Sequence, residues 1–329
     1  MISLNRSENS AEFSLEFENK VLKMIKSNFH KLSFYPEELE KEFIKNVAKK
    51  QGILENQIVT GNGIEGLLHL TLETFNKECT KLTILDPSFV VYEDLAKESG
   101  MEIQKISIKN NKINKNELLS TKEDLMIIAD PNNPLGDKYL DDKFLQKLSQ
   151  KGSVIIIDLC YSGFNINPNK FKNYQNIIFL KSFSKYEGLA GIRLGFAYGD
   201  SKIIQKIKDK QKKICPFPIS ALSYLVGMVA LEKETGKEIN FLKNKTNFIS
   251  QLKEIKKLEI YDNNTTSILI NLEKNKISAK SFYQEINKQK IMIKNPNTYP
   301  SLGPKKIILG IPSKKVINMV VHTIKKIIN

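Results

Sequence analysis

The chain has 329 residues, enough to bury a sizeable core as one large domain or two unequal ones. Hydrophobic residues make up 41% of it without forming a long apolar run, so we expect no membrane-spanning helix. The formal net charge is +15, but the basic residues are almost all lysines spread along the chain. This spread disfavours nucleic-acid binding as the main function and favours an attraction for small anionic substrates.

The N-terminus, MISLNRSENS, has neither the basic region nor the apolar core of a secretory signal. The three cysteines are scattered, as in a protein with reduced thiols, so we expect a cytoplasmic location. The three histidines also lie far apart. The sequence therefore predicts no metal site and no histidine-based catalytic triad.

The first predicted elements are an amphipathic helix over residues 37–51 and a glycine turn at 60–66, TGNGIEG, that opens a helical run. The turn has the spacing G-x-G-x-x-G, and Asp86 ends the strand-like run that comes next. Such a turn offers free N–H groups and a positive helix end to a phosphate. Alone it is compatible with a dinucleotide site or with a cradle for another phosphate.

Strand-like runs then alternate with helical ones through the middle of the chain. They lie at 82–86, 102–108, 125–130, 153–158, 176–182 and 195–200. The runs at 125–130 and 153–158 are nearly all apolar, which is typical of strands covered on both faces. The alternation predicts an α/β domain with a mostly parallel sheet.

After about residue 200 the character of the chain changes. A lysine-rich helical stretch runs to about 256, with a break at 215–220 where Pro216 and Pro218 interrupt regular structure. The remaining elements are a strand at 267–273, a helix at 278–289, strands at 290–294 and 305–311, and a closing helix. This order favours a smaller α+β domain at the C-terminus.

The most informative stretch is 181–198, KSFSKYEGLAGIRLGFAY. Lys185 follows a predicted strand between Ser182, Ser184 and the later Arg193. A lysine amine forms a Schiff base with an aldehyde, and hydroxyls with a guanidinium suit a phosphate. Pyridoxal 5′-phosphate (PLP) needs both groups; the alternative is a solvated lysine in a turn.

This stretch resembles the cofactor-lysine signature S-x-S-K-x-x-G-L-A-G-x-R-x-G-F of class I and II aminotransferases, which are fold type I PLP enzymes. Further segments resemble the family's landmarks in the family's order, at 3–9, 34–39, 60–66, 86–93, 130–136, 158–161 and 216–220. Within the family the chain looks most like the histidinol-phosphate aminotransferases and the threonine-phosphate decarboxylases. The resemblance implies a large PLP-binding α/β domain over 36–235 with a mostly parallel central sheet. It implies a smaller α+β domain made of 1–35 and 236–329.

The resemblance also implies roles for single residues. Lys185 holds PLP and later moves the substrate's Cα proton, and Asp158 pairs with the N–H of the pyridine ring. Asn133 and Tyr161 hydrogen-bond the ring oxygen, and Phe89 stacks on the ring. The phosphate is held by Gly63, Ile64, Glu65, Ser182, Ser184 and Arg193, and by Tyr35 from the second subunit of a homodimer with its active site at the interface. The glycine turn is therefore interpreted as a cradle for the phosphate of PLP rather than for a dinucleotide.

The chain departs from the family's pattern at two places. The acid of the family's G-N-G-x-x-E turn falls on Gly66, with Glu65 one position early. The late-strand arginine that usually pairs with the substrate carboxylate falls on Ile307 or Ile308. Losing a bidentate arginine is not a conservative change.

Three explanations of the missing arginine stay open. Lys294 or Lys306 binds the substrate anion as a point charge, or Arg6 supplies the charge from the N-terminal segment. Otherwise the substrate lacks an α-carboxylate, as an amino-alcohol phosphate does.

We therefore predict a PLP-dependent aminotransferase that acts between a glutamate-like donor and a small, phosphorylated keto or aldehyde compound. The alternative is a PLP-dependent decarboxylase of an O-phospho amino acid, of the threonine- or serine-phosphate type. A more remote alternative is a non-catalytic or nucleic-acid-binding protein.

Overall fold

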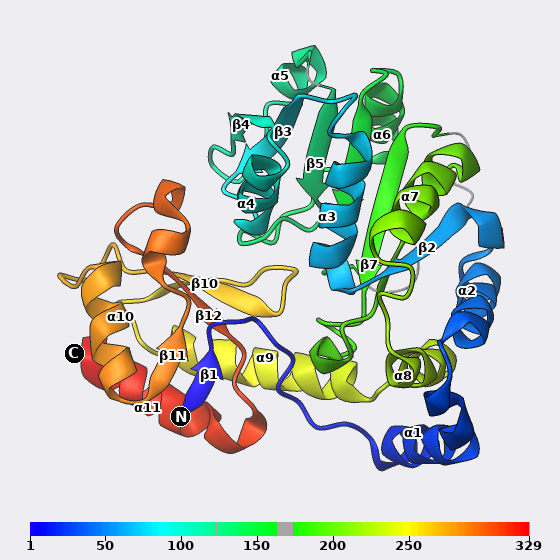
Figure 1. Cartoon of the computed structure of the whole chain (residues 1–329). Coiled ribbons are helices and arrows are strands. Elements are labelled where there is room, and N and C mark those ends of the chain that lie inside the picture. The colour runs from blue at the N-terminus through cyan, green and yellow to red at the C-terminus, as the bar shows by residue number, and fades with distance from the viewer. Residues whose placement is uncertain (123, 163–173, 329) are drawn as a thin grey trace.

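A seven-stranded sheet forms the centre of the larger part of the molecule in the computed structural model, which describes residues 1–122, 124–162 and 174–328 (Figure 1). Its strands are β2 (Ile58–Gly61), β3 (Lys81–Asp86), β4 (Glu102–Ser107), β5 (Leu125–Ala129), β6 (Val154–Asp158), β7 (Ile177–Ser182) and β8 (Gly195–Gly199). They are ordered β2-β8-β7-β6-β5-β3-β4. β8 runs antiparallel to both of its neighbours, and the other pairs are parallel. The predicted α/β fold with a mostly parallel sheet is confirmed.

Helices cover both faces of this sheet. Along β6, Ile155 and Ile157 enter one hydrophobic core and Ile156 enters another, because successive side chains of a strand point to opposite faces. The first core is closed by α2 (Glu37–Gln51), α5 (Lys115–Ser120), α6 (Asp142–Ser149) and α8 (Ala221–Glu232). The second is closed by α3 (Gly63–Phe75), α4 (Val91–Glu98) and α7 (Ser201–Ile214). This double cover explains why the central strands are apolar throughout.

The predicted helix at 37–51 is confirmed as α2, and its sequence explains both of its ends. Three glutamates lie in its first turn and two lysines in its last, which complements the helix dipole. The helix ends at Gly52, which takes a left-handed conformation with φ of 64°. Its buried side chains include Leu39, Phe43 and Val47, spaced along one face.

The predicted lysine-rich helical stretch contains two breaks. The break at Pro216 and Pro218, between α7 and α8, was predicted from the sequence. A second break before α9 (Lys237–Lys253) was not predicted: Lys233 is extended and Gly236 is left-handed, with φ of 78°. Glycine takes this conformation without the strain that a Cβ would cause. The second break turns the chain from the larger part into the smaller one.

The smaller part has the predicted α+β character. Its antiparallel sheet consists of β9 (Glu259–Tyr261), β10 (Ser267–Asn271) and β12 (Lys306–Gly310), with β10 in the centre. The helices α9, α10 (Ala279–Lys288) and α11 (Ile317–Ile328) pack around a core of its own. In none of the ranges 1–122, 124–162 and 174–328 is there a helix with the length and apolar character of a membrane span.

The N-terminal segment connects the two parts. β1 (Ile2–Leu4) pairs in parallel with β11 (Ile291–Ile293) of the smaller part, a pairing that the sequence did not predict. The chain then crosses to α1 (Leu15–Ser27), which packs on α8 (Figure 1). Phe17 of α1 lies in the core of the larger part. The division into a domain of residues 36–235 and a domain of residues 1–35 and 236–329 remains a proposal. In this division α1 belongs to the smaller domain but contacts the core of the larger part.

Candidate active site

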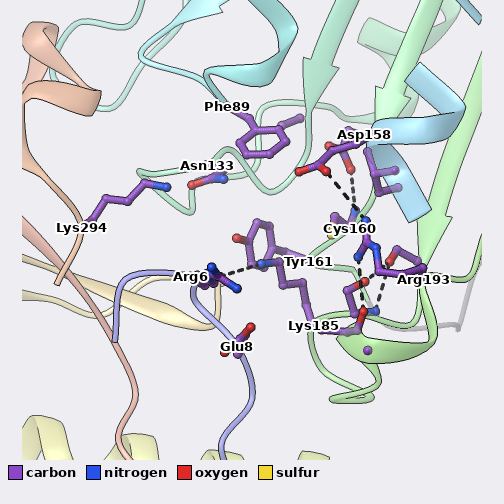
Figure 2. Close-up of a pocket in the computed structure, with 17 residues that line it drawn as sticks. Arg6, Glu8, Phe89, Asn133, Asp158, Cys160, Tyr161, Lys185, Arg193 and Lys294 are labelled. Atoms are coloured by element: carbon purple, nitrogen blue, oxygen red, sulfur yellow. Dashed lines mark hydrogen bonds and ion pairs between the residues drawn. The ribbon is translucent and has the colours of Figure 1, made fainter. Parts of the chain in front are cut away.

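A cavity of about 630 Å³ lies at the carboxyl ends of β6 and β7, against the N-terminal segment and the smaller part (Figure 2). In open α/β sheets this end of the strands is the usual ligand site. The predicted site residues that line the cavity are Arg6, Ile64, Glu65, Phe89, Asn133, Asp158, Tyr161, Ser182, Ser184, Lys185, Arg193 and Lys294. Glu8 and Cys160 also line it; they lie in the landmark segments 3–9 and 158–161 but were not predicted as site residues.

Three predicted site residues are not among the described residues that line the cavity. Gly63 lies behind it: an added Cβ there would be 2.8 Å from Nη2 of Arg193. The ring of Tyr35 is exposed and stacks on that of Phe217, with 4.8 Å between ring centroids. Lys306 starts β12, where it is paired across the sheet with Asn271.

Asp158 ends β6 and is only 5% exposed. Its Oδ2 accepts a hydrogen bond of 2.6 Å from the phenol of Tyr92, and its Oδ1 accepts one of 2.8 Å from the backbone N–H of Cys160. Burial raises the pKa of the carboxyl, and the hydrogen bond from Tyr92 opposes that rise. The sequence did not single out Tyr92, although it lies near Phe89 in the landmark segment 86–93.

Lys185 lies in the loop after β7, and its amine faces the N-terminal segment. Nζ donates to the backbone carbonyl of Arg6 at 3.1 Å and to that of Ser7 at 3.4 Å. The same atom lies 5.6 Å from the centroid of the Tyr161 ring (Figure 2). The structure thus brings together two segments that lie far apart in the sequence, the N-terminal segment and the loop that carries Lys185.

The other end of the cavity has the composition of a phosphate cradle. Ser182 donates to the hydroxyl of Ser184 at 2.8 Å, and Nη2 of Arg193 lies 3.8 Å from a carboxylate oxygen of Glu65. The amino-terminal end of α3 supplies backbone N–H groups beside them. The Arg193 and Glu65 side chains are 46% and 55% exposed, so their ion pair is weak and free to rearrange around an anion.

Besides Lys185, two cations line the cavity without an ion-pair partner in the described part of the chain, Arg6 and Lys294. Lys294 follows β11, and Figure 2 shows its side chain extending toward Asn133. Burial lowers the pKa of Lys294, and the charge of Lys185 lowers it further. An unpaired, half-buried cation is costly unless an anion binds beside it.

The late strand β12 presents no cation to this region. Ile308 lies in an apolar cluster with Leu135, Leu269 and Tyr299, while Ile307 faces the core of the smaller part. The Tyr299 phenol donates to Oδ1 of Asn133 at 3.4 Å. Of the two positions left open by the sequence, Ile308 is therefore the one on the side of Asn133.

A buried pair of charges supports the loop that carries Lys185. Lys181 is 1% exposed, and its amine donates to the backbone carbonyls of Ser162 and Leu159. Burial lowers the pKa of Lys181 and raises that of Glu187, and the attraction between the two charges opposes both shifts. Both residues lie in the stretch 181–198, but the sequence analysis predicted no role for either.

The described ranges contain no candidate metal-binding site. No group of three or more His, Cys, Asp or Glu side chains there could hold a metal ion. The cavity's polar groups are instead an amine, a buried carboxylate, a phenol and cations. This set suits a small organic ligand with a phosphate group.

Comparison with known proteins agrees with this chemistry. The sequence profile of the family described as aminotransferase class I and II matches residues 1–324. The histidinol-phosphate aminotransferase of Microcystis aeruginosa is 26% identical over 276 residues, which cover 82% of this chain and 77% of that protein.

Two solved structures share the fold over 99% of both chains. The histidinol-phosphate aminotransferase from Clostridium acetobutylicum has a TM-score of 0.86 at 22% identity. The L-threonine-O-3-phosphate decarboxylase from Porphyromonas gingivalis has a TM-score of 0.81 at 19% identity. One fold thus carries both of the reaction types that the sequence left open.

Proposed function

The chain belongs to the aminotransferase class I and II family, whose members depend on PLP, and from this premise we propose that it is an aminotransferase of the histidinol-phosphate type. Its reaction moves an amino group between a glutamate-like donor and a small phosphorylated keto or amino compound. The proposal rests on one observation: a lysine amine, a buried carboxylate and a phosphate cradle line the same cavity.

The side chains of the cavity fit PLP. The hydroxyls of Ser182 and Ser184, the guanidinium of Arg193 and the start of α3 suit its phosphate. Asp158 is buried and has acceptor capacity left, which suits the N–H of the pyridine ring. Lys185 is the amine for the aldehyde. When bound, PLP supplies an electron sink for the charge that develops at the substrate's Cα.

The remaining cavity residues complete this assignment. We assign Phe89 to the face of the ring, and Asn133 and Tyr161 to its oxygen. Once the amine of Lys185 is free, it takes the proton from Cα of the amino donor, and in the second half of the reaction it delivers a proton to Cα of the acceptor. The phenol of Tyr161 lies beside that amine, where it orients the reacting groups.

The phosphate end is open to solvent in the single chain, which supports a homodimer. Arg193 and Glu65 are both about half exposed there. Tyr35 is 79% exposed, and its stacked partner Phe217 is partly exposed. We propose that a second copy covers this end and that its Tyr35 contributes to the phosphate site. An exposed aromatic pair is a suitable anchor for such an interface.

We assign the substrate anion to Arg6 and Lys294. Both line the cavity, and neither has an ion-pair partner among the described residues. Lys306 is a weaker candidate because it is not among the lining residues. Glu8, also in the lining, would disfavour a second anion close to Arg6. This arrangement favours a small substrate with one strongly anionic end.

The test is a visible spectrum of the purified protein with PLP, before and after L-glutamate is added. We expect a yellow form that requires Lys185 and that glutamate converts to the colourless aminated cofactor. A Lys185→Ala variant that gives the same yellow form contradicts the assignment of the lysine. An unchanged spectrum with glutamate contradicts glutamate as the donor.

A second candidate, a decarboxylase of an O-phospho amino acid, is favoured by one observation. The position expected to hold the substrate carboxylate lies at Ile308, within an apolar cluster. A decarboxylase must not lock the carboxylate in the plane of the ring, so it tolerates this loss. Release of carbon dioxide from O-phosphothreonine, without amino transfer, would support this candidate against the first.

A further inference from the structure

The loop before β10, residues 262–266, extends from the smaller part to the segment of the larger part that follows Asn133. Nδ2 of Asn263 donates to the carbonyl of Pro134 at 3.2 Å, and Nδ2 of Asn264 donates to that of Gly136 at 3.1 Å. Pro134 and Gly136 lie one and three residues after the cavity residue Asn133. The loop is therefore docked on the larger part beside the site.

The docking is close and well supported. An added Cβ at Gly136 would lie 2.3 Å from Cβ of Asn263, so the two backbones approach each other without room for a side chain. On the other side, Lys245 holds the loop from within the smaller part. Its amine donates to the carbonyl of Thr265 at 3.2 Å and pairs with Asp262 at 2.9 Å. The loop is thus a fixed platform.

Thr266, the last residue of this platform, is fully buried and holds the N-terminal segment. Its hydroxyl donates to the backbone carbonyl of Ser7 at 2.6 Å. Ser7 has φ of 53°, a left-handed conformation that strains a residue with a Cβ. Such a conformation persists only where its surroundings hold it. The hydrogen bond from Thr266 is the contact that fixes the Ser7 carbonyl.

The conformation of Ser7 decides where two carbonyls point. Those of Arg6 and Ser7 both accept from the amine of Lys185, at 3.1 and 3.4 Å. Burial raises the pKa of the Tyr161 phenol, and the nearby Thr266 hydroxyl opposes that rise. One hydroxyl of the smaller part thus holds the N-terminal segment and lies near Tyr161 of the site.

We propose that Thr266 is a positioning residue for Lys185. Its hydroxyl fixes Ser7 so that the carbonyls of Arg6 and Ser7 hold the lysine amine inside the cavity whenever that amine is free. This rests on the proposed role of Lys185. Without the hydroxyl, Ser7 relaxes, the two acceptors turn away, and the amine samples positions outside the cavity.

Three variants test the proposal. Thr266→Val removes the hydroxyl and keeps the shape of the side chain, whereas Thr266→Ser keeps the hydroxyl. Thr83→Val is the matched control, because Thr83 in β3 is also fully buried and its hydroxyl has no hydrogen-bond partner in the described residues. Thr266→Ala replaces Thr266→Val if the latter does not fold, as judged by circular dichroism.

The readout is the rate at which cofactor-free protein develops its visible absorbance band after mixing with PLP. We expect Thr266→Val to be roughly five- to tenfold slower than wild type, the size of one net hydrogen bond. Thr266→Ser and Thr83→Val should match wild type within about twofold. Faster hydrogen exchange in residues 5–9, in Thr266→Val but not in Thr83→Val, should accompany the slower rate.

The outcomes separate this inference from the proposed function. Loading of Thr266→Val at the wild-type rate overturns the inference, even if its melting temperature falls. A wild-type protein that develops no band, or a Lys185→Ala variant that develops the same band, overturns the proposed function instead.

Discussion

Tyr92 donates a 2.6 Å hydrogen bond to Asp158, and its side chain has no exposed surface. The contact lies beneath the cavity, because Asp158 lines the cavity and Tyr92 does not. Phe89 meets the Tyr92 ring edge-on, with 5.6 Å between centroids, so the tyrosine supports both the carboxylate and the aromatic wall. A residue of the core thereby sets the charge and position of a residue of the site.

Tyr92→Phe should weaken PLP binding by about tenfold, because a hydrogen bond to a charged group is lost. Burial raises the pKa of Asp158 and Tyr92 opposes that rise, so the pKa of Asp158 rises further in the variant. A higher pKa means that the carboxylate is lost at a higher pH as pH falls, so the defect should grow on acidification. Equilibrium titration with PLP at several pH values measures this. Tyr283→Phe, in α10 of the smaller part, is the control and should bind like wild type.

Lys294→Met should raise the KM for an anionic substrate by about tenfold with little change in kcat, as expected when one charge contact is lost. Lys306→Met is the matched control and should leave KM unchanged. Burial lowers the pKa of Lys294, so its charge is lost at a lower pH than that of an exposed lysine as pH rises. The wild-type KM should therefore rise with alkaline pH, and the rise should be absent in Lys294→Met. Equal effects of the two substitutions would contradict the assignment.

Gly63→Ala should lower PLP affinity by more than its effect on stability explains. The residue has φ of 66°, and an added Cβ would lie 2.8 Å from Nη2 of Arg193, so the guanidinium must move. Gly100 is the matched control, since it has φ of 73° and open space around its Cβ position. Both alanine variants should lose about 1 kcal/mol of stability in urea unfolding. Weaker PLP binding should occur at Gly63 alone.

Lys181→Met should destabilise the protein by about 3 kcal/mol, because it leaves Glu187 buried without its opposite charge. Burial raises the pKa of Glu187, so the penalty applies as pH rises through that raised value and the carboxyl ionises. The loss of stability should therefore be larger at about pH 8 than at about pH 5. The double variant Lys181→Met/Glu187→Leu should recover most of it. Urea unfolding at both pH values checks this, and an equal loss at both would contradict the pairing.

The sequence predicted much of the fold. The apolar strands at 125–130 and 153–158, the helix at 37–51 and the break at Pro216 are local signals, and each appears at or near its expected residues. β1 and β9 were missed because a strand of three residues has no readable periodicity and neither of them is an apolar run, unlike β11, which is apolar throughout. The break at Gly236 was missed because a single glycine within a helical pattern is a weak signal.

Most residues that line the cavity were also named from the sequence, since they lie in ordered motifs that resemble one family. The sequence by itself determined which residue types are present: Lys185, Asp158, the glycine turn, and an isoleucine where an arginine is usual. These follow from local spacing, which a motif records. The sequence left open which cation binds the substrate anion, because that depends on contacts between the two parts of the molecule.

Only the tertiary structure decided those contacts. It turned Ile308 toward an apolar cluster, brought Lys294 into the cavity and left Lys306 outside it. It also placed Thr266 against Ser7, two residues far apart in the chain. Such pairs arise because the packing of two cores brings distant segments together. The residues on either side of each partner do not indicate the contact, so it cannot be predicted from one sequence.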